Sequence, residues 1–375
     1  MINIGEPKLE GNRLSNKIDV PDNFKHHLNE SEFFASYDVN IDADESILNI
    51  PAVCSMLPLA WYNGLDIHVG SIDGTFLKSM KVLHRKYCEV YPDLLFETNI
   101  LVDNVVKNVV EGDGVALTFS GGIDSMYSLS RLHDLKPRLV TLFRFTHRSQ
   151  HRGFFDKIVG HYKERFETEM NVVDTNMREL TKEGNYTYLA IRQTPHQIGA
   201  LAPMSIGRFN RVFTAGGGVP IYSGLAVDER IRVPDIEDNF AWADLSVRVH
   251  GFFYRHEKFP SIIEFMDGFD GLKIQTCWFP SLFGGARIEF DFNCGNCPKC
   301  ASGIIGLLIR GRNPNHYGFD VDDSTWDKLK NGFNVWGHFR RYIVPMQLFI
   351  RENGMPEGDY HGSRAFLEWF KEAKI

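Results

Sequence analysis

Short apolar runs alternate with helical stretches over the middle of the chain, from about residue 114 to residue 276. Strands are predicted at 114–119, 138–145, 170–174, 211–215 and 271–276, with helices between them at 125–134, 153–168, 195–207 and 261–268. Strands that alternate with helices favour a parallel sheet with helices on both faces. We therefore predict an α/β fold with a five-stranded parallel sheet, whose carboxyl strand ends meet along one edge.

The chain on either side of this region follows a different pattern. The first thirty residues are polar and show no periodicity, so no helix or strand is predicted there, and short β-rich runs follow at 33–39 and 65–72. A helical stretch runs from Gly74 to Tyr91 and stops at a proline. Three parts are predicted: an N-terminal mixed β/α extension over residues 1–105, a central domain over 106–310, and a C-terminal helical extension over 311–375.

Residues 120–125 read Ser-Gly-Gly-Ile-Asp-Ser and directly follow the first apolar strand. Glycines let the backbone approach an anion, and the N-terminus of the following helix adds partial positive charge. The spacing is neither a Walker A loop nor a dinucleotide Gly-x-Gly-x-x-Gly, and a plain strand-to-helix turn is the alternative. Asp124 would repel bare phosphate, which indicates a bound Mg²⁺ or a capping role. We expect a phosphate site formed by Ser120, Gly121, Gly122, Ile123, Asp124 and Ser125.

Four of the six cysteines gather near the end of the central region. Two residues separate Cys294 from Cys297 and Cys297 from Cys300, and Cys277 lies upstream. Four thiolates complete a closed tetrahedral zinc site of the structural kind. A disulfide pair, an iron–sulfur cluster and a persulfide-carrying cysteine are the alternatives. We predict that these four cysteines bind Zn²⁺.

Composition narrows the class of protein. The 375 residues exceed one minimal core, and the 43% apolar content is ordinary for a globular protein. A net charge of −7 argues against a general nucleic-acid binder, because phosphate contacts need clustered Lys and Arg. No apolar stretch follows a charged start, and no run approaches the length of a membrane span. We expect a cytoplasmic protein with reduced thiols and no membrane partner.

Together, the two motifs resemble those of a known enzyme family. The Ser-Gly-Gly-x-Asp-Ser signature is similar to that of the PP-loop ATP pyrophosphatases. With Thr276-Cys277-Trp278 and the later cysteines, the chain resembles the 7-cyano-7-deazaguanine synthases of the queuosine pathway. The resemblance covers about residues 112–305. Gly303 stands where the family commonly has arginine, and the connection from Cys277 to Cys294 is longer than usual, so a divergent paralogue is indicated.

The resemblance implies a fold, a reaction and a set of residues. The fold would be the Rossmann-like, adenine nucleotide alpha hydrolase-like sheet with a zinc knuckle. ATP and Mg²⁺ would adenylate the carboxylate of 7-carboxy-7-deazaguanine or a related base, and an amine would then form an amide or nitrile. The implied catalytic residues are Ser120, Asp124, Ser125 and Arg192; Phe143 and Arg148 would contact the nucleotide; Arg192, Asp228 and Asp235 would bind the base.

The acceptor and the biological setting stay open at this point. Ammonia is the family's usual acceptor amine. Relatives with extra domains occur in antiphage defence gene clusters, where the amine could belong to a protein. We expect a homodimer. A tRNA-modifying or thiolating PP-loop enzyme and a non-catalytic nucleotide sensor are the other functions that this sequence admits.

Overall fold

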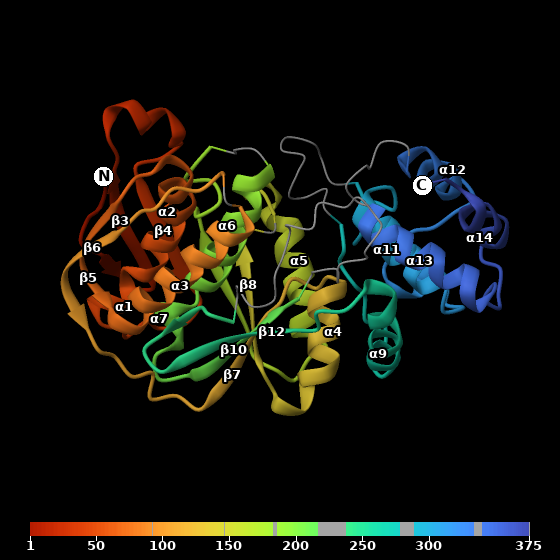
Figure 1. The fold of residues 1–375 in the computed structure, drawn as a ribbon. Coiled ribbons are helices and arrows are strands. Elements are labelled where there is room, and N and C mark those ends of the chain that lie inside the picture. Colours follow the sequence, from red (N-terminus) through yellow and green to blue (C-terminus); the bar gives the residue numbers. More distant parts are fainter. Residues whose placement is uncertain are drawn as a thin grey trace.

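A computed structural model describes residues 1–91, 93–145, 147–182, 186–216, 238–277, 289–333 and 340–374. The strands lie in one half of the molecule and the C-terminal helices in the other (Figure 1). Within the described residues, twelve strands form a single mixed sheet. Its strands are β1 (Ile2–Ile4), β2 (Lys8–Glu10), β3 (Arg13–Asp19), β4 (Glu32–Tyr37), β5 (Ile67–Asp73), β6 (Ile100–Val106), β7 (Gly114–Thr118), β8 (Arg138–Phe143), β9 (Met170–Thr175), β10 (Phe209–Ala215), β11 (Ala241–Trp242) and β12 (Leu245–His250).

Five neighbouring strands of this sheet run parallel, in the order β9-β8-β7-β10-β12. The first of them in the chain, β7, is therefore central, and the chain turns to opposite sides of it. Four of these strands were predicted, but the fifth was predicted wrongly at 271–276. The fifth parallel strand is β12, whose alternating Leu245 and Val247 are buried. Residues 271–276 form no strand.

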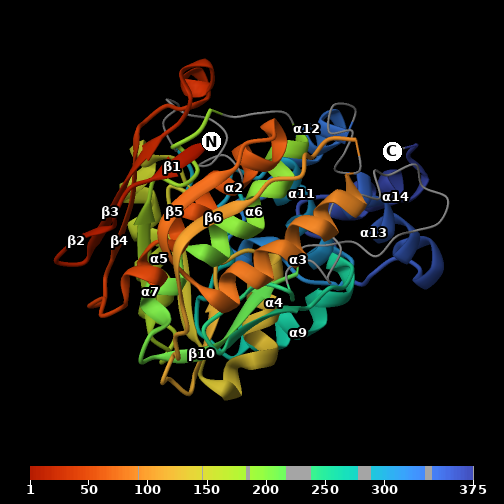
Figure 2. The same cartoon turned by 60° about the vertical axis from the view of Figure 1, so that its left-hand side comes forward.

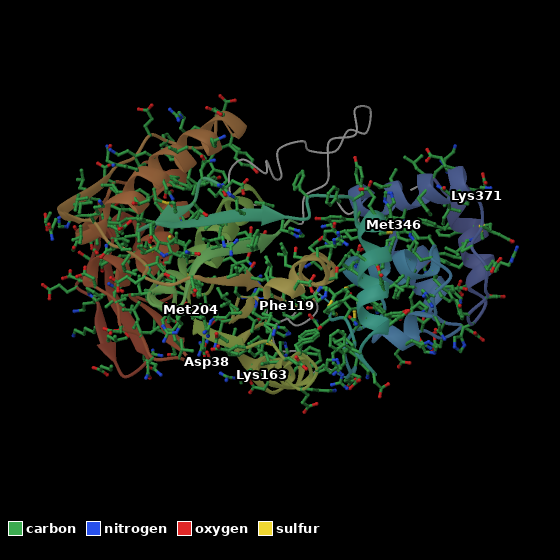
Figure 3. All side chains as sticks on the ribbon, turned by 90° about the horizontal axis from the view of Figure 1, so that it is seen from below. Asp38, Phe119, Lys163, Met204, Met346 and Lys371 are labelled. Carbon is green, nitrogen blue, oxygen red and sulfur yellow. The ribbon has the colours of Figure 1, made fainter. Side chains whose placement is uncertain are left out.

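The N-terminal strands continue the same sheet. Strand β4 pairs antiparallel with β9, placing Ala35 opposite Thr175, and β3, β1, β5 and β6 follow outward. The prediction of no element in the first thirty residues is wrong, because β1, β2 and β3 lie there. Beyond the sheet, Lys163 and Asp38 form an ion pair of 3.8 Å between central and N-terminal segments (both labelled in Figure 3). The predicted boundary at residue 105 falls inside β6, and the three-part division stays a prediction.

Helices cover both faces of the central strands. Successive residues of β7 are buried on opposite faces of the sheet, since Ala116 belongs to one apolar cluster and Leu117 to the other. This two-sided burial is typical of parallel sheets. Figure 2 shows β5 and β6 beside α2 and α3. The α-helices are α1 (Glu45–Leu48), α2 (Ile50–Asn63), α3 (Gly74–Val90), α4 (Ile123–Leu132), α5 (Arg152–Lys163), α6 (Tyr186–Gly199), α7 (Ala202–Ser205), α9 (Arg255–Asp267), α11 (Pro298–Leu308), α12 (Thr325–Phe333), α13 (Arg340–Asn353) and α14 (Ser363–Glu372).

Helix α2 lies between the β-rich runs predicted at 33–39 and 65–72, where no helix was predicted. All residues from Ile50 to Trp61 are buried, so the helix has no polar face to give a helical period. Its prolines, Pro51 in the first turn and Pro58 in the interior, also read as breaks in the sequence. None of the helices in the described part of the chain combines the length and apolar character needed to cross a membrane.

Candidate nucleotide loop and four-cysteine centre

The Ser-Gly-Gly loop lies at the carboxyl end of the central strand β7 and opens helix α4, as predicted. Gly121 has φ +74°, a left-handed conformation that favours glycine, and a Cβ there would clash with the Tyr162 ring. The Tyr162 hydroxyl donates to the Gly121 carbonyl at 3.2 Å. The hydroxyls of Ser120 and Ser125 lie 3.3 Å apart. No side chain caps the N-terminus of α4 at Gly122, so the helix presents backbone N–H groups there.

Two cations from helix α9 hold Asp124, the acid of the loop. Lys258 Nζ donates to Asp124 Oδ1 at 2.6 Å and to the Gly216 carbonyl at 2.6 Å. Arg255 Nη2 donates to Asp124 Oδ2 at 3.3 Å. The Lys258 side chain is fully buried, whereas Asp124 keeps 20% of its side-chain surface exposed. Both carboxylate oxygens of Asp124 thus accept hydrogen bonds from positive groups.

The charges at this cluster set the protonation of its members. Burial opposes ionisation of Asp124, but Lys258 and Arg255 outweigh it and hold the pKa of that carboxyl well below its usual range. Burial lowers the pKa of Lys258, and the Asp124 charge counteracts this. The ammonium therefore depends on Asp124 to stay charged inside the protein. One carboxylate against two cations leaves this side of the loop positive, which favours an anionic ligand.

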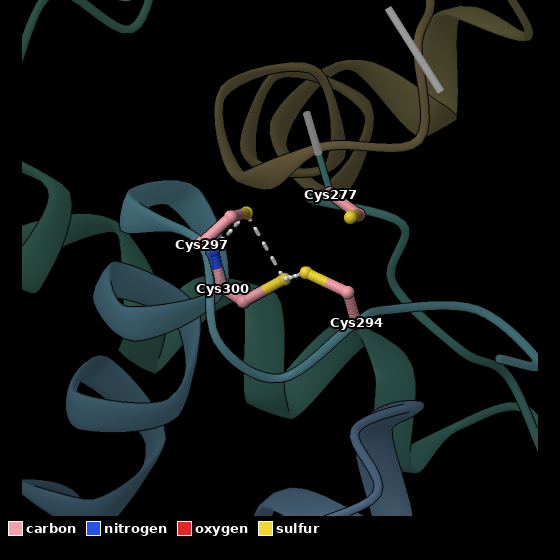
Figure 4. A group of neighbouring side chains, drawn as sticks. All are labelled: Cys277, Cys294, Cys297 and Cys300. Atoms are coloured by element: carbon pink, nitrogen blue, oxygen red, sulfur yellow. Dashed lines mark hydrogen bonds between the residues drawn. The ribbon is translucent and has the colours of Figure 1, made fainter. Parts of the chain in front are cut away.

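The four predicted cysteines come together in a single cluster (Figure 4). Cys297 and Cys300 lie at the start of α11, while Cys294 and Cys277 approach from two separate segments. All four sulfur atoms lie within 4.8 Å of one another. The cluster is compatible with zinc binding, because tetrahedral sites take four thiolates.

The distances between the sulfur atoms distinguish a metal site from a disulfide. Sγ of Cys300 lies 3.8 Å from Cys294 Sγ and 3.4 Å from Cys297 Sγ. Zn–S bonds of about 2.3 Å at tetrahedral angles put sulfurs about 3.8 Å apart, whereas a disulfide requires about 2.05 Å. All four cysteines are free thiols. Burial and the neighbouring sulfurs raise the pKa of Cys300, so a bound cation would favour its thiolate form.

Asn293 connects this cluster to the Ser-Gly-Gly loop. The Asn293 Oδ1 accepts from the backbone N–H of Thr276 at 2.8 Å and of Cys277 at 3.1 Å. Its Nδ2 donates to the Ile274 carbonyl at 2.7 Å. These bonds satisfy the backbone of 274–277 without a strand partner, which explains the wrongly predicted strand. In the same segment, Gln275 N–H donates to the Gly121 carbonyl at 2.9 Å, two residues before the first cysteine of the cluster.

The remaining predicted site residues are only partly placed. Phe143, at the end of β8, is buried against Phe155, with the Arg152 guanidinium 4.9 Å from its ring. Arg148 precedes the short helix Ser149–His151. Arg192 belongs to α6, but its side chain lies outside the described residues. Asp228 and Asp235 also lie outside them.

Three residues of the site were not predicted from the sequence. Arg255 and Lys258 stand three apart on a charged helix start, a pattern that usually indicates a solvated helix face. Asn293 precedes a cysteine without any distinguishing motif. No protein-family model, curated protein or solved structure matches this chain significantly.

Proposed function

We propose that this protein is an ATP-dependent ligase that adenylates the carboxylate of 7-carboxy-7-deazaguanine or a related base. One observation carries the proposal: the Ser-Gly-Gly-Ile-Asp-Ser loop opens α4 at the carboxyl end of the central parallel strand. In open parallel sheets, ligands bind outside the carboxyl strand ends, where the chain turns to opposite sides. The order third, second, first, fourth, fifth of the parallel strands is the Rossmann-like order, and it supports the same fold assignment.

The residues around the loop fit the charge of a triphosphate. Backbone N–H groups at the start of α4 and the hydroxyls of Ser120 and Ser125 supply donors for phosphate oxygens. Arg255 and Lys258 supply positive charge from the other side of Asp124. Because both oxygens of Asp124 already bind these cations, we assign to Asp124 the orientation of Lys258 and Arg255. Mg²⁺, carried by the phosphates of ATP, would offset the charge on departing pyrophosphate.

The proposed reaction has two steps. A carboxylate oxygen of the substrate attacks the α-phosphorus, the bond to pyrophosphate breaks, and an acyl-adenylate forms. The nitrogen of an amine then attacks the carbonyl carbon, loses a proton, and expels AMP, which keeps the attacking carboxylate oxygen. The protein contributes positioning and electrostatic stabilisation of the phosphoryl charge, with no covalent nucleophile.

The four-cysteine cluster supports this branch of the PP-loop proteins. We propose that Cys277, Cys294, Cys297 and Cys300 hold one Zn²⁺ with no open position, so that its role is structural. The segment from Gln275 to Cys277 joins the cluster to the loop through the Gly121 carbonyl. The metal would therefore fix one wall of the nucleotide site, and chemistry would occur at the loop.

The test follows an oxygen atom. The protein is incubated with Mg·ATP, ammonium and 7-carboxy-7-deazaguanine that carries ¹⁸O in its carboxylate. Mass spectrometry then identifies the nucleotide products and their ¹⁸O content. We expect AMP and pyrophosphate, with one ¹⁸O in AMP. ADP as the only nucleotide product, or AMP without label, would exclude the acyl-adenylate. Pyrophosphate release at the same rate without the base would mean that water or a group of the protein attacks the α-phosphorus, and would contradict activation of this carboxylate.

A further inference from the structure

Arg255 is the point at which three parts of the chain meet. Its guanidinium donates from Nη2 to Asp124 in the loop and from Nη1 to Ser302 Oγ at 2.9 Å, on the helix that begins at the cysteine cluster. Its Cζ lies 3.9 Å from the ring centroid of Tyr342 in α13. The Arg255 side chain is only 7% exposed. Helix α13 of the C-terminal extension thus contacts Arg255, which forms an ion pair with Asp124 of the loop.

A second stack of the same kind lies one heptad further along α13. The Arg310 Cζ lies 4.4 Å from the ring centroid of Phe349, seven residues after Tyr342 and therefore on the same helix face. Arg310 Nη2 donates to the His256 carbonyl at 2.9 Å, in the first turn of α9. Two aromatic rings of α13 thus contact arginines at the start of α9, one within its first turn and one hydrogen-bonded to it, and Met346 between the rings is buried in the shared core (labelled in Figure 3).

Within the described part of the chain, hydrogen bonds alone do not satisfy every donor of the Arg255 guanidinium group, so the ring of Tyr342 can contribute to its orientation. The Nε of Arg255 is buried and has no hydrogen-bond partner among the described residues. Two single hydrogen bonds from Nη1 and Nη2 to different elements allow the guanidinium plane to tilt. Stacking on a ring fixes that plane, and desolvated cation–π contacts are stronger than exposed ones. Lys258 follows three residues later on the same helix, so its position depends on the same contact.

We infer that Tyr342 is a positioning residue for the Ser-Gly-Gly loop, acting through Arg255. The C-terminal extension is in this view a built-in part of the nucleotide site. Losing the ring frees Arg255 from Asp124, loosens α4 and reduces the positive charge presented to phosphate. The expected effect on ATP affinity rests on the proposed function, whereas the effect on loop mobility does not.

The test compares Tyr342→Ala with Tyr342→Phe, which keeps the ring, and with Trp369→Ala. Trp369 on α14 lies 5.6 Å from the Lys330 ammonium and packs on Phe333, so its loss weakens the extension at a distance from α9. Hydrogen exchange of peptides covering residues 119–126 is measured in all variants and in the intact wild-type chain. Affinity for Mg·ATP is measured by calorimetry.

We expect Tyr342→Ala to speed exchange of the loop peptides and to weaken ATP binding about tenfold. Tyr342→Phe should stay close to wild type, and Trp369→Ala should change neither loop exchange nor ATP affinity, whatever it does to Tm. Equal loop exchange in Tyr342→Ala and wild type, or equal acceleration in Trp369→Ala, would overturn the inference. If wild type binds no ATP, the proposed function fails while the exchange data still decide the role of Tyr342.

Discussion

Asp124 is held by contacts that reach it from a helix more than a hundred residues away. Its partners Lys258 and Arg255 lie on α9, and the lysine is fully buried. Removing one member of a buried ion pair leaves an uncompensated charge, which costs more than the pair itself contributes. We therefore expect the acid of the loop to matter for folding as well as for the proposed ligand binding.

Asp124→Asn should lower the free energy of unfolding by about 3 kcal/mol at pH 7, because Lys258 loses its counter-charge. The pKa of Asp124 is depressed in the folded protein, so its contribution is full above the unfolded-state pKa of about 4 and is lost on further acidification. The gap between variant and wild type should therefore shrink below pH 4. Urea unfolding at pH 7, 5 and 3 measures it.

Asp156→Asn is the matched control, since Asp156 pairs with Arg152 on an exposed helix face and exposed pairs contribute little. That variant should stay near wild-type stability at every pH. A gap for Asp124→Asn that is the same at pH 3 and pH 7 would contradict the ion-pair explanation.

At the scale of elements, the turn from β7 to α4 contains two glycines whose backbone conformation and surroundings differ. Gly121 has positive φ and is in contact with the Tyr162 ring, whereas Gly122 has φ −80° and has room for a Cβ at ordinary contact distances. The nearest atom to a Cβ on Gly122 would be Ser120 Oγ at 3.4 Å, an ordinary contact. Stability and ligand approach are therefore separable within one loop.

Gly121→Ala should reduce both Tm and ATP affinity, because left-handed φ costs about 1–2 kcal/mol for alanine and the methyl clashes with Tyr162. Gly122→Ala should keep Tm within a few degrees but weaken ATP binding, since its methyl occupies the side from which phosphate would approach. Thermal unfolding and calorimetry with Mg·ATP measure both. Unchanged ATP affinity in Gly122→Ala would show that phosphate does not approach this glycine.

The cysteine cluster joins α11 to the segment that follows α9. Cys297→Ser should remove the metal and with it folding free energy on the order of 10 kcal/mol, the scale of structural zinc sites. We expect lower Tm and loss of soluble protein, with elemental analysis showing zinc in wild type only. Cys88→Ser, outside the cluster, is the control and should keep both metal and Tm. Iron in fresh wild-type protein, or stable protein without any metal, would refute the zinc assignment.

At the scale of the whole molecule, the N-terminal extension and the central strands share one sheet and one core. The β4–β9 pairing and the apolar cluster that contains both Phe33 and Val173 cross the predicted boundary. Removing the extension would expose the edge of β9 and a large apolar face. The two parts are therefore expected to fold together.

Deleting residues 1–106 should yield aggregated or insoluble protein, because β9 loses its antiparallel partner and the core loses its cover. Co-expression of residues 1–110 with residues 111–375 should restore a soluble complex, detected by co-purification and size-exclusion chromatography. A truncated protein that is soluble, with the Tm of the full chain, would show instead that the extension is a separable unit.

Local sequence was sufficient for four of the five parallel strands and for locating both motifs. The strands at 114–118, 138–143 and 170–175 combine apolar runs with turn residues, and α4 follows its loop directly, so short-range pattern decides them. The four cysteines were chosen by ligand type and spacing, and their cluster is confirmed. Residues that act through chemistry close in sequence could be predicted in this way.

Tertiary contacts decided the rest. Helix α2 is buried on every side, so no period marks it, and the buried Asn16 interrupts the apolar alternation of β3. Segment 271–276 has the sequence pattern of a strand, but its backbone forms hydrogen bonds with the Asn293 side chain and with Gly121 and Tyr317 in place of a neighbouring strand. Arg255 and Lys258 reach Asp124 only because α9 packs against α4, and Tyr342 contacts Arg255 only because α13 packs beside α9. Such contacts join residues distant in the chain, so no local pattern encodes them.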